Sequence, residues 1–342
     1  MIRKFLSLFT VIVGFILIPG VTFAAGSFYE GKTVRIIVGY PPGGGYDTYV
    51  RIIARHMGRN IPGNPNIIVE NMPGAGSLVA ANYLYKIAKP DGLIIGHVGG
   101  GQLLRQVFGE PGIQFDARKF EYLGAPVAGN AICVTTKASG ITSIDKWIGA
   151  KTPVKMGGHG PGTMIDTVLR IAKEGLGFPT QIVTGYAGSP GIFLAMDSGE
   201  VAGTVVDWES LSVVRPKDLE RGNWVVILQT KPKPYPDLPN VPLAINFAKT
   251  DEARQLVEWG LHKHSTLTRP FFLPPGTPKG LVQILEESFQ KTMKDKELLA
   301  EAKGIRLSFD PVSADDLREA IAGFFKLPPA MLAKLNEIIF KE

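Results

Sequence analysis

Glycine-rich loops that follow apolar segments are the parts of this chain best suited to chemistry. The stretch V-R-I-I-V-G-Y-P-P-G-G-G-Y-D-T (34–48) passes through three consecutive glycines into a helical pattern that opens at Asp47 or Thr48. Glycine lets a ligand approach the backbone closely, and the unpaired N–H groups of a helix's first turn attract an anion. We therefore expect an anion or polar ligand at this loop, with Asp47 capping the helix.

Two further loops repeat this design. The stretch E-N-M-P-G-A-G-S (70–77) leads into a helical pattern that Ser77 is expected to cap, and V-K-M-G-G-H-G-P-G-T (154–163) opens another helix. For 70–77, the alternative to a ligand role is an ordinary tight turn between a strand and a helix. Two such openings far apart in the sequence indicate two domains whose loops face each other across a cleft.

Polar residues at strand ends add to these loops. His97 and His159 are each suited to donate a hydrogen bond to a ligand carboxylate, or to bond backbone within their own loops. Asp207 ends an apolar run and is suited to orient a ligand donor or to hold a loop. Trp208 follows it, and either stacks on a flat ligand or packs in the core.

The sequence does not match the motifs for catalysis, cofactor binding or metal binding that some of its residues suggest. The glycines at 43–45 fail the dinucleotide pattern G-x-G-x-x-G at its last position, and Ser189 lacks the first glycine of G-x-S-x-G. His262 and His264 have no acid or cysteine cluster beside them, so we expect a surface pair and no metal site. We therefore expect a chain without catalytic residues, cofactor or metal.

Short apolar runs alternate with helical patterns along most of the chain, which predicts parallel sheets with crossover helices. Cys133 lies in one of these runs and is expected to be a packed core thiol. The expected strands are 34–39, 66–70, 93–98, 120–127, 131–136, 154–158, 180–186, 201–207 and 223–229, with a short one at 271–273. The expected helices are 47–59, 77–88, 142–149, 163–175, 189–199, 250–262, 278–296, 297–303 and 313–326.

Composition describes a globular chain with a separate N-terminal segment. The 342 residues are 45% hydrophobic with a formal net charge of +6, and the dispersed Lys and Arg argue against nucleic-acid binding. Residues 1–25 contain a basic start, an apolar stretch at 5–18 and a small-residue exit. That stretch is shorter than the roughly 20 residues needed to span a bilayer, so we expect a removable secretory signal peptide.

Longer motifs carry a resemblance to a known family. The segments Y-P-P-G-G-G-Y-D (40–47), I-V-E-N-M-P-G-A-G-S (68–77) and P-D-G-L (90–93) resemble signature motifs of the extracytoplasmic solute receptors of tripartite tricarboxylate transporters, the TctC or Bug family. Y-A-G (186–188), L-P-N-V-P (238–242) and P-P-G-T-P (274–278) are similar to later motifs of the same family.

The resemblance implies a two-domain α/β fold like that of type II periplasmic binding proteins, with a ligand cleft between two doubly wound domains. It implies one domain at 27–125 plus 241–342 and another at 126–240. It further implies a monomeric periplasmic receptor that binds a small organic carboxylate through backbone amides and delivers it to inner-membrane permease subunits. The alternative from another class is a periplasmic sensor that hands its closed form to a signalling partner.

The chain departs from the family pattern at Tyr46 and Ser77, where small residues and glycine are usual, and at His159. Tyr46, together with His97, His159 and Trp208, favours an aromatic or bulky carboxylate. The residues expected to bind the ligand lie in the loops and strand ends described above: Gly43, Gly44, Gly45, Tyr46, Asp47, Gly74, Ala75, Gly76, Ser77, His97, His159, Gly160, Thr163, Tyr186, Gly188, Asp207 and Trp208.

Overall fold

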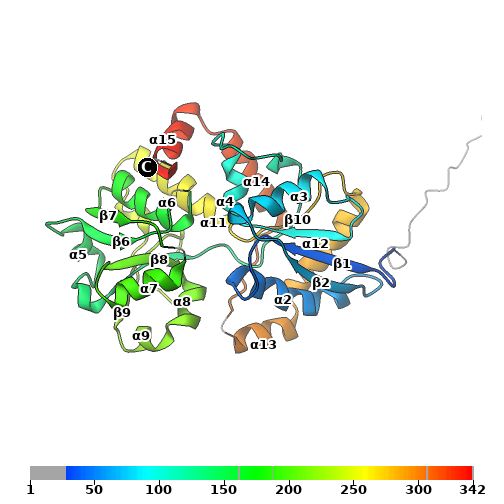
Figure 1. The fold of residues 1–342 in the computed structure, drawn as a ribbon, viewed down its shortest axis with the longest axis horizontal. Coiled ribbons are helices and arrows are strands. Elements are labelled where there is room, and N and C mark those ends of the chain that lie inside the picture. The colour runs from blue at the N-terminus through cyan, green and yellow to red at the C-terminus, as the bar shows by residue number, and fades with distance from the viewer. Residues whose placement is uncertain (1–27, 161, 187, 306, 341–342) are drawn as a thin grey trace, which may run out of the picture.

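The computed structural model describes residues 28–160, 162–186, 188–305 and 307–340, which form two lobes side by side along the long axis of the molecule (Figure 1). Each lobe contains one five-stranded sheet with helices packed on both faces. The predicted two-lobed, doubly wound α/β fold is therefore confirmed. The predicted signal peptide at 1–25 lies outside the described residues.

The first sheet has the strand order β2-β1-β3-β10-β4. Its strands are β1 Thr33–Val38, β2 Asn66–Asn71, β3 Ile94–His97, β4 Glu121–Gly124 and β10 Phe271–Leu273. The helices that pack on it are α2 Gly45–Met57, α3 Leu78–Lys86, α4 Gly100–Arg105, α12 Lys279–Met293, α13 Lys296–Gly304 and α14 Ala314–Phe325.

The second sheet has the order β7-β6-β8-β5-β9. Its strands are β5 Ala131–Thr136, β6 Val154–Gly157, β7 Thr180–Val183, β8 Gly203–Asp207 and β9 Trp224–Gln229. The remaining α-helices of the described residues are α5 Ile144–Ile148, α6 Met164–Arg170, α7 Ser189–Asp197, α8 Trp208–Val214, α9 Pro216–Glu220, α10 Asp251–Val257, α11 His264–Thr266 and α15 Pro329–Phe340. Both α6 and α10 continue as π-helical turns, at Ile171–Gly175 and Glu258–Lys263.

Both sheets are mixed, whereas the sequence predicts parallel sheets. In the first sheet β10 runs antiparallel to β3 and β4, and in the second β5 runs antiparallel to β8 and β9. Both exceptional strands follow a passage of the chain from one lobe to the other, at 125–130 and 264–270 (Figure 1). A strand that enters its sheet at the lobe junction runs away from the junction, in the direction opposite to strands that end at the junction.

The core follows the alternation of side chains along each strand. In β1, Ile37 packs on one face with α3, α4 and α14, while Ile36 and Val38 pack on the other with α2, α12 and α13. In β5, Cys133 faces one cluster, and Ile132 and Val134 face the other. Cys133 is buried as predicted, and burial raises the pKa of its thiol to about 12.

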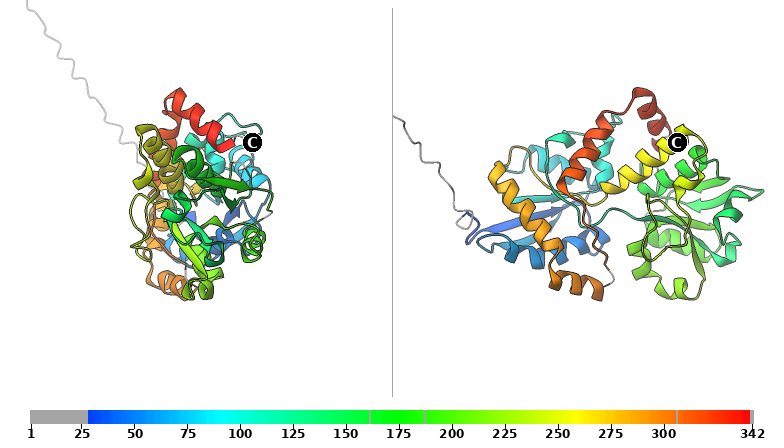
Figure 2. Two further views of the ribbon diagram at one scale, coloured as in Figure 1. Left: turned by 90° about the vertical axis from the view of Figure 1, so that its left-hand side faces the viewer. Right: turned by 180° about the vertical axis from the view of Figure 1, so that it is seen from behind.

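The C-terminal helix α15 lies on the second lobe, although α14 just before it packs on the first (Figures 1 and 2). Leu335 and Ile338 of α15 share a hydrophobic cluster with Leu169 of α6 and Leu256 of α10. The sequence prediction groups 241–342 with the first lobe, whereas this packing brings α10 and α15 beside the second sheet. The exact domain boundaries stay a prediction.

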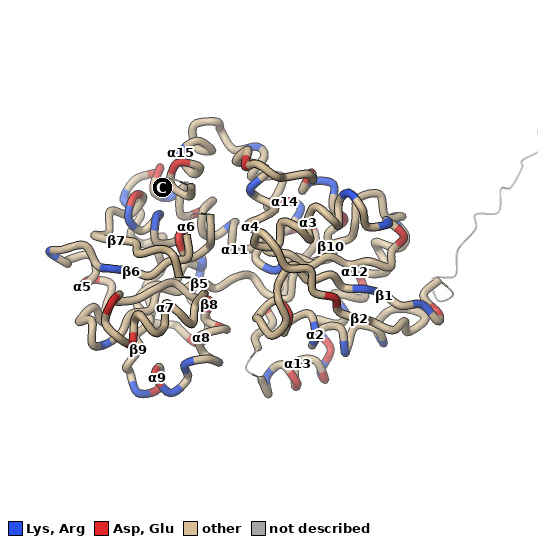
Figure 3. Tube along the Cα trace, in the orientation of Figure 1, with Lys and Arg blue, Asp and Glu red and all other residues tan. Residues whose placement is uncertain are grey.

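Charged residues of both signs are interspersed over both lobes (Figure 3). None of the helices among the described residues is long and apolar enough to span a membrane. The predicted surface pair of histidines is wrong, because His264 is buried at the end of the α10 helical segment and burial lowers its pKa to about 4.

Candidate functional site

The carboxyl ends of β1, β2 and β3 bring the predicted loops of the first lobe together. These strands are parallel, and Val38 pairs with both Asn71 and His97, so the three strands end at one level. Two glycines permit the close approach of the loops that follow. A Cβ atom at Gly39 would lie 2.3 Å from the Cβ of Ser77, and one at Gly99 would lie 2.2 Å from the hydroxyl of Tyr40.

The glycine loop at 43–45 is exposed, and its anchor is Asp47. The buried Asp47 carboxylate accepts hydrogen bonds from the Gly43 N–H at 2.8 Å, from Arg51 Nε at 2.8 Å and from Asn71 Nδ2 at 2.9 Å. Although burial raises the pKa of Asp47, these bonds bring it below its ordinary value. The predicted cap is wrong, because Gly44 is the N-cap of α2 and Asp47 lies inside the first turn.

The second loop, at 74–77, has a left-handed backbone throughout. Gly74, Ala75, Gly76 and Ser77 all have positive φ, and Ser77 reaches +80°. The Ser77 hydroxyl makes no cap bond to α3. Instead it accepts the Gly99 N–H at 3.0 Å, fully buried. The predicted cap is therefore wrong here too, and the side chain of Ser77 joins two loops within the first lobe.

Tyr46 is packed among other side chains at this edge. Its ring stacks on Tyr40 with centroids 4.1 Å apart and lies 5.3 Å from the ring of His97. Its hydroxyl donates a hydrogen bond to the Thr268 carbonyl at 2.8 Å. The ring therefore forms part of the packed wall of this edge, where the backbone at 268 approaches from the passage between the lobes.

His97 is fully buried and bonds the backbone, which is one of its two predicted roles. Its Nδ1 lies 3.1 Å from the Pro270 carbonyl. Burial, and then the charge of Arg269, lower the pKa of His97 to about 3, so the ring is neutral. Because Nδ1 carries the proton that bonds Pro270, the buried Nε2 is an acceptor, and it has no partner.

Arg269 is the central residue that the sequence analysis missed. It precedes β10, whose first residue, Phe271, pairs with His97, so the antiparallel strand places Arg269 at the edge where β1 and β3 end. The residue is 2% exposed, and its guanidinium lies 5.3 Å from the ring of Tyr46 and 5.1 Å from that of Tyr49.

The guanidinium of Arg269 also reaches the second lobe. Its Nη2 donates to Asp207 Oδ2 at 3.0 Å, while Nε and Nη1 have no partner. A Cβ atom at Gly45 would lie 3.9 Å from Arg269 Nη2 and 3.9 Å from the hydroxyl of Ser210 on α8. The first turn of α2, with its unpaired N–H groups, therefore begins beside this ion pair and beside the second lobe.

The end of β8 supplies the acids of the second lobe. Asp207 is a quarter exposed, and Glu209, in the first turn of α8, is 2% exposed with both carboxylate oxygens unpartnered. Burial, and then the charge of Asp207, raise the pKa of Glu209 to about 7. Trp208 takes the second of its two predicted roles, because its half-buried ring packs against the hydrophobic cluster that contains Val206 and Leu211, and its indole N–H donates to Asp237 Oδ2 at 3.0 Å.

The other predicted residues of the second lobe make contacts within that lobe. The N–H groups of His159 and Gly160 and the hydroxyl of Thr163 all donate to the buried carboxylate of Asp166, at 2.9, 2.9 and 2.8 Å. Thr163 also caps α6. The loop amides predicted to face a ligand are therefore bonded to Asp166.

Tyr186 also bonds within the second lobe, since its hydroxyl donates to Glu200 at 2.7 Å. Gly188 is the N-cap of α7. Among the predicted residues of the second lobe, Asp207 differs from these, because its side chain bonds Arg269 of the first lobe.

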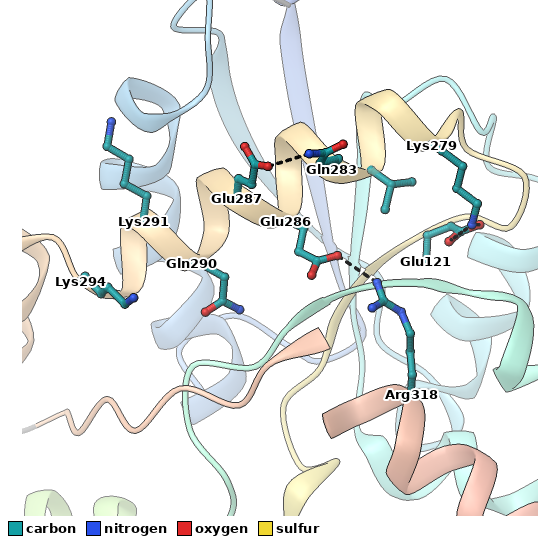
Figure 4. A pocket seen from close by; sticks show the side chains of 10 residues that line it. Glu121, Lys279, Gln283, Glu286, Glu287, Gln290, Lys291, Lys294 and Arg318 are labelled. Atoms are coloured by element: carbon teal, nitrogen blue, oxygen red, sulfur yellow. Dashed lines mark hydrogen bonds and ion pairs between the residues drawn. The ribbon is translucent and has the colours of Figure 1, made fainter. Parts of the chain in front are cut away.

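A pocket of about 680 Å³ beside α12 is distinct from this site (Figure 4). Four of its charged residues form two ion pairs: Lys279 bonds Glu121, and Arg318 bonds Glu286, each at 2.9 Å. Glu121 begins β4, at the far end of the sheet from the loops. The candidate site is therefore the junction of the two lobes, centred on Arg269 and Asp207.

Comparison with known proteins decides the family. The model of the tripartite tricarboxylate transporter family receptor, TctC, matches residues 50–316. This chain belongs to that family of receptors. Its members are non-enzymatic binding proteins, in agreement with the expectation from sequence. The family resemblance drawn from the loop motifs is thereby confirmed.

Individual proteins are similar to this chain over most of its length. A protein of Cupriavidus necator described as "UPF0065 protein in gbd 5'region" is 27% identical over 274 residues, covering 78% of this chain and 76% of the relative. A TctC solute-binding protein from Polaromonas has a TM-score of 0.68 at 16% identity, covering 91% of this chain and 99% of its own. MatC of Rhodopseudomonas palustris, with bound malate, has a TM-score of 0.63 at 17% identity, covering 90% and 99%.

Proposed function

We propose that this receptor is exported to the periplasm, captures a small organic carboxylate between its lobes and delivers it to the inner-membrane permease of a tripartite transporter. The observation that carries the proposal is the lobe junction itself. A buried guanidinium with two unpartnered nitrogens lies beside the open first turn of α2, and both features attract a carboxylate. The malate bound by a relative of the same fold supports this ligand class.

The arrangement of the site also suits a receptor that closes around its ligand. The loops of 43–45 and 74–77 belong to the first lobe, and Asp207 belongs to the second. The chain passes between the lobes at 125–130, at 264–270 and again between α14 and α15. Rotation about these passages would separate Asp207 from Arg269 and admit a ligand to the junction. A closed, loaded form of this kind is what a membrane permease can distinguish from the empty one.

Thermal denaturation with a ligand panel tests the proposal. A ligand that binds only the folded chain raises the melting temperature by mass action. We expect a rise for at least one acid among citrate, C4 and C6 dicarboxylates, amino acids and benzoate-type acids. The matched control is the amide or ester of each acid, in which every carboxylate is neutralised, and it should leave the melting temperature unchanged. A panel without any shift, on protein refolded to remove bound ligand, would contradict the carboxylate assignment.

Export is tested separately. The full-length gene, expressed in a Gram-negative host, should release the protein on osmotic shock, with an N-terminus beginning between residues 24 and 27 by mass spectrometry. Recovery of the intact N-terminus in the cytoplasmic fraction would contradict the periplasmic assignment and leave the ligand assignment untouched.

A further inference from the structure

Four buried side chains at the lobe junction have hydrogen-bonding atoms without partners. These are His97 at 0% exposure, Asn130 at 0%, Glu209 at 2% and Arg269 at 2%. Buried polar groups in proteins are paired in about 90% of cases or more, so four unpaired ones in one place indicate a missing partner. Together with Asp207, we refer to them as the junction cluster.

Backbone and side-chain contacts bring the junction cluster together from four separate parts of the chain. Asn130 lies next to Ala131, which pairs with Asp207, and the Asn130 carbonyl accepts the Trp208 N–H at 3.0 Å. Arg269 bonds Asp207, and Glu209 follows Asp207 by two positions.

The backbone at 129 also packs against the segment that carries Arg269. A Cβ atom at Gly129 would lie 2.3 Å from the hydroxyl of Thr268. His97 joins through the Pro270 carbonyl, directly after Arg269. The residues that carry the unpartnered atoms therefore come from both lobes and lie beside the passages between them.

The unpartnered atoms include donors and acceptors. The donors are on Arg269, at Nε and Nη1, and on the Asn130 amide nitrogen. The acceptors are both oxygens of Glu209, the Asn130 amide oxygen and Nε2 of His97. A fully ionised di- or tricarboxylate offers acceptors alone, so it would leave the acceptors of Glu209 and His97 unpaired. A ligand with a carboxylate and an amino group offers both kinds.

The charges favour the same kind of ligand. In the junction cluster one guanidinium faces the two acids Asp207 and Glu209, and Lys231, the next cation in electrostatic range of Glu209, lies 3.5 Å from Asp310. An ammonium group would bring the missing positive charge. A second ligand carboxylate would place another negative charge beside the two acids.

We propose that the junction cluster binds the carboxylate and ammonium groups of a zwitterionic amino acid, so that the receptor selects an amino-carboxylate over the same acid without its amino group. The inference rests on the proposed carboxylate-binding function and names its ligand class. In this arrangement Arg269 and the Asn130 amide nitrogen donate to the carboxylate, while Glu209 accepts from the ammonium group.

The arrangement has a pH dependence of defined sign. Glu209 is faced by Asp207, which raises its pKa, by Arg269 and Lys231, which lower it, and by the phenols of Tyr49 and Tyr235. An ammonium group binds the ionised form of Glu209, so the affinity for an amino acid should rise as the pH increases through about 7. The affinity for a dicarboxylate should fall over the same range.

Matched pairs of ligands test the inference by titration calorimetry. The pairs differ by the amino group alone: aspartate and succinate, glutamate and glutarate, alanine and propionate, phenylalanine and 3-phenylpropionate. At pH 8 we expect the amino member of at least one pair to bind more than about tenfold tighter, the factor for one charge-assisted hydrogen bond. Glu209→Gln should remove that advantage, and Glu220→Gln, on the exposed surface of α9, should keep it.

The pH dependence needs no variant, and so tests the inference even where Glu209→Gln fails to fold. Equal or tighter binding of the amino-free member in every pair that binds, or an affinity for the amino member that falls from pH 6 to pH 8, would overturn the inference and leave the carboxylate receptor standing. Binding by no acid of either kind would overturn both.

Discussion

The ion pair between Arg269 and Asp207 leads to an asymmetric prediction for stability. Its two side chains differ in exposure, at 3% for Arg269 and 24% for Asp207. At a separation of 3.0 Å and an effective dielectric constant of about 20, their attraction is on the order of 5 kcal/mol. The variants Asp207→Ala and Arg269→Met both lose this attraction, but they leave different groups behind.

Asp207→Ala leaves a cation almost without access to water. Glu209 replaces part of the lost charge, so we expect the free energy of unfolding to fall by about 3 kcal/mol, within the range for breaking a buried pair. Arg269→Met leaves a carboxylate that water can reach, and it removes a guanidinium with two unpartnered nitrogens. We expect that loss to be about 1 kcal/mol or less.

Urea unfolding of the ligand-free protein at pH 7, followed by tryptophan fluorescence and compared at equal m-values, measures both changes. The double variant should lose less than the sum of the single losses. The exposed pair Lys334 and Glu252, 3.6 Å apart, is the matched control, and its single variants should each change stability by less than about 0.5 kcal/mol. A loss for Arg269→Met equal to that for Asp207→Ala would refute the reasoning.

Three further variants or probes follow from buried groups. Glu209 has a pKa raised to about 7, so its ionisation opposes folding as the pH rises above its ordinary pKa. Glu209→Gln should therefore stabilise the ligand-free protein by on the order of 1–3 kcal/mol at pH 8 and by much less at pH 5. Equal gains at both pH values in urea unfolding would contradict this. Ser77→Ala leaves the Gly99 N–H buried without an acceptor and should cost about 1–2 kcal/mol, whereas an unchanged urea midpoint would show that the loop does not depend on this bond. The Cys133 thiol should react with a thiol reagent in urea and not in the native protein, and fast labelling of the folded chain would argue against its burial.

The sequence predicted the parts of the site that depend on local pattern. Apolar runs followed by glycines marked the ends of parallel strands, so the loops at 43–45 and 74–77 were found before their positions were known. Arg269 was missed because its place depends on the direction of β10. The short strand at 271–273 was predicted, but a strand of three residues carries no sign that it runs against its neighbours.

Glu209 and Asn130 were missed for related reasons. Helix α8 follows β8 directly, without a loop or a turn residue between them, so no local pattern indicated that Glu209 lies in the first turn of a helix. Asn130 precedes β5, the other strand that runs against its neighbours. Conversely, Asp47 and Ser77 were predicted as caps because their residue types favour that role. Instead, Asp47 bonds Asn71 at the end of β2, and Ser77 bonds Gly99, so each joins two separate segments of the chain.

The late positions of β10 and α15 affect how the chain folds as it is made. The first sheet needs the strand at 271–273 between β3 and β4, and the core of the second lobe needs Leu335 and Ile338, a few residues from the end. Neither lobe has a complete core until these segments have left the ribosome, and contacts so distant in sequence form slowly. The earlier strands of each lobe therefore have to wait for these late segments before their hydrophobic faces are fully covered.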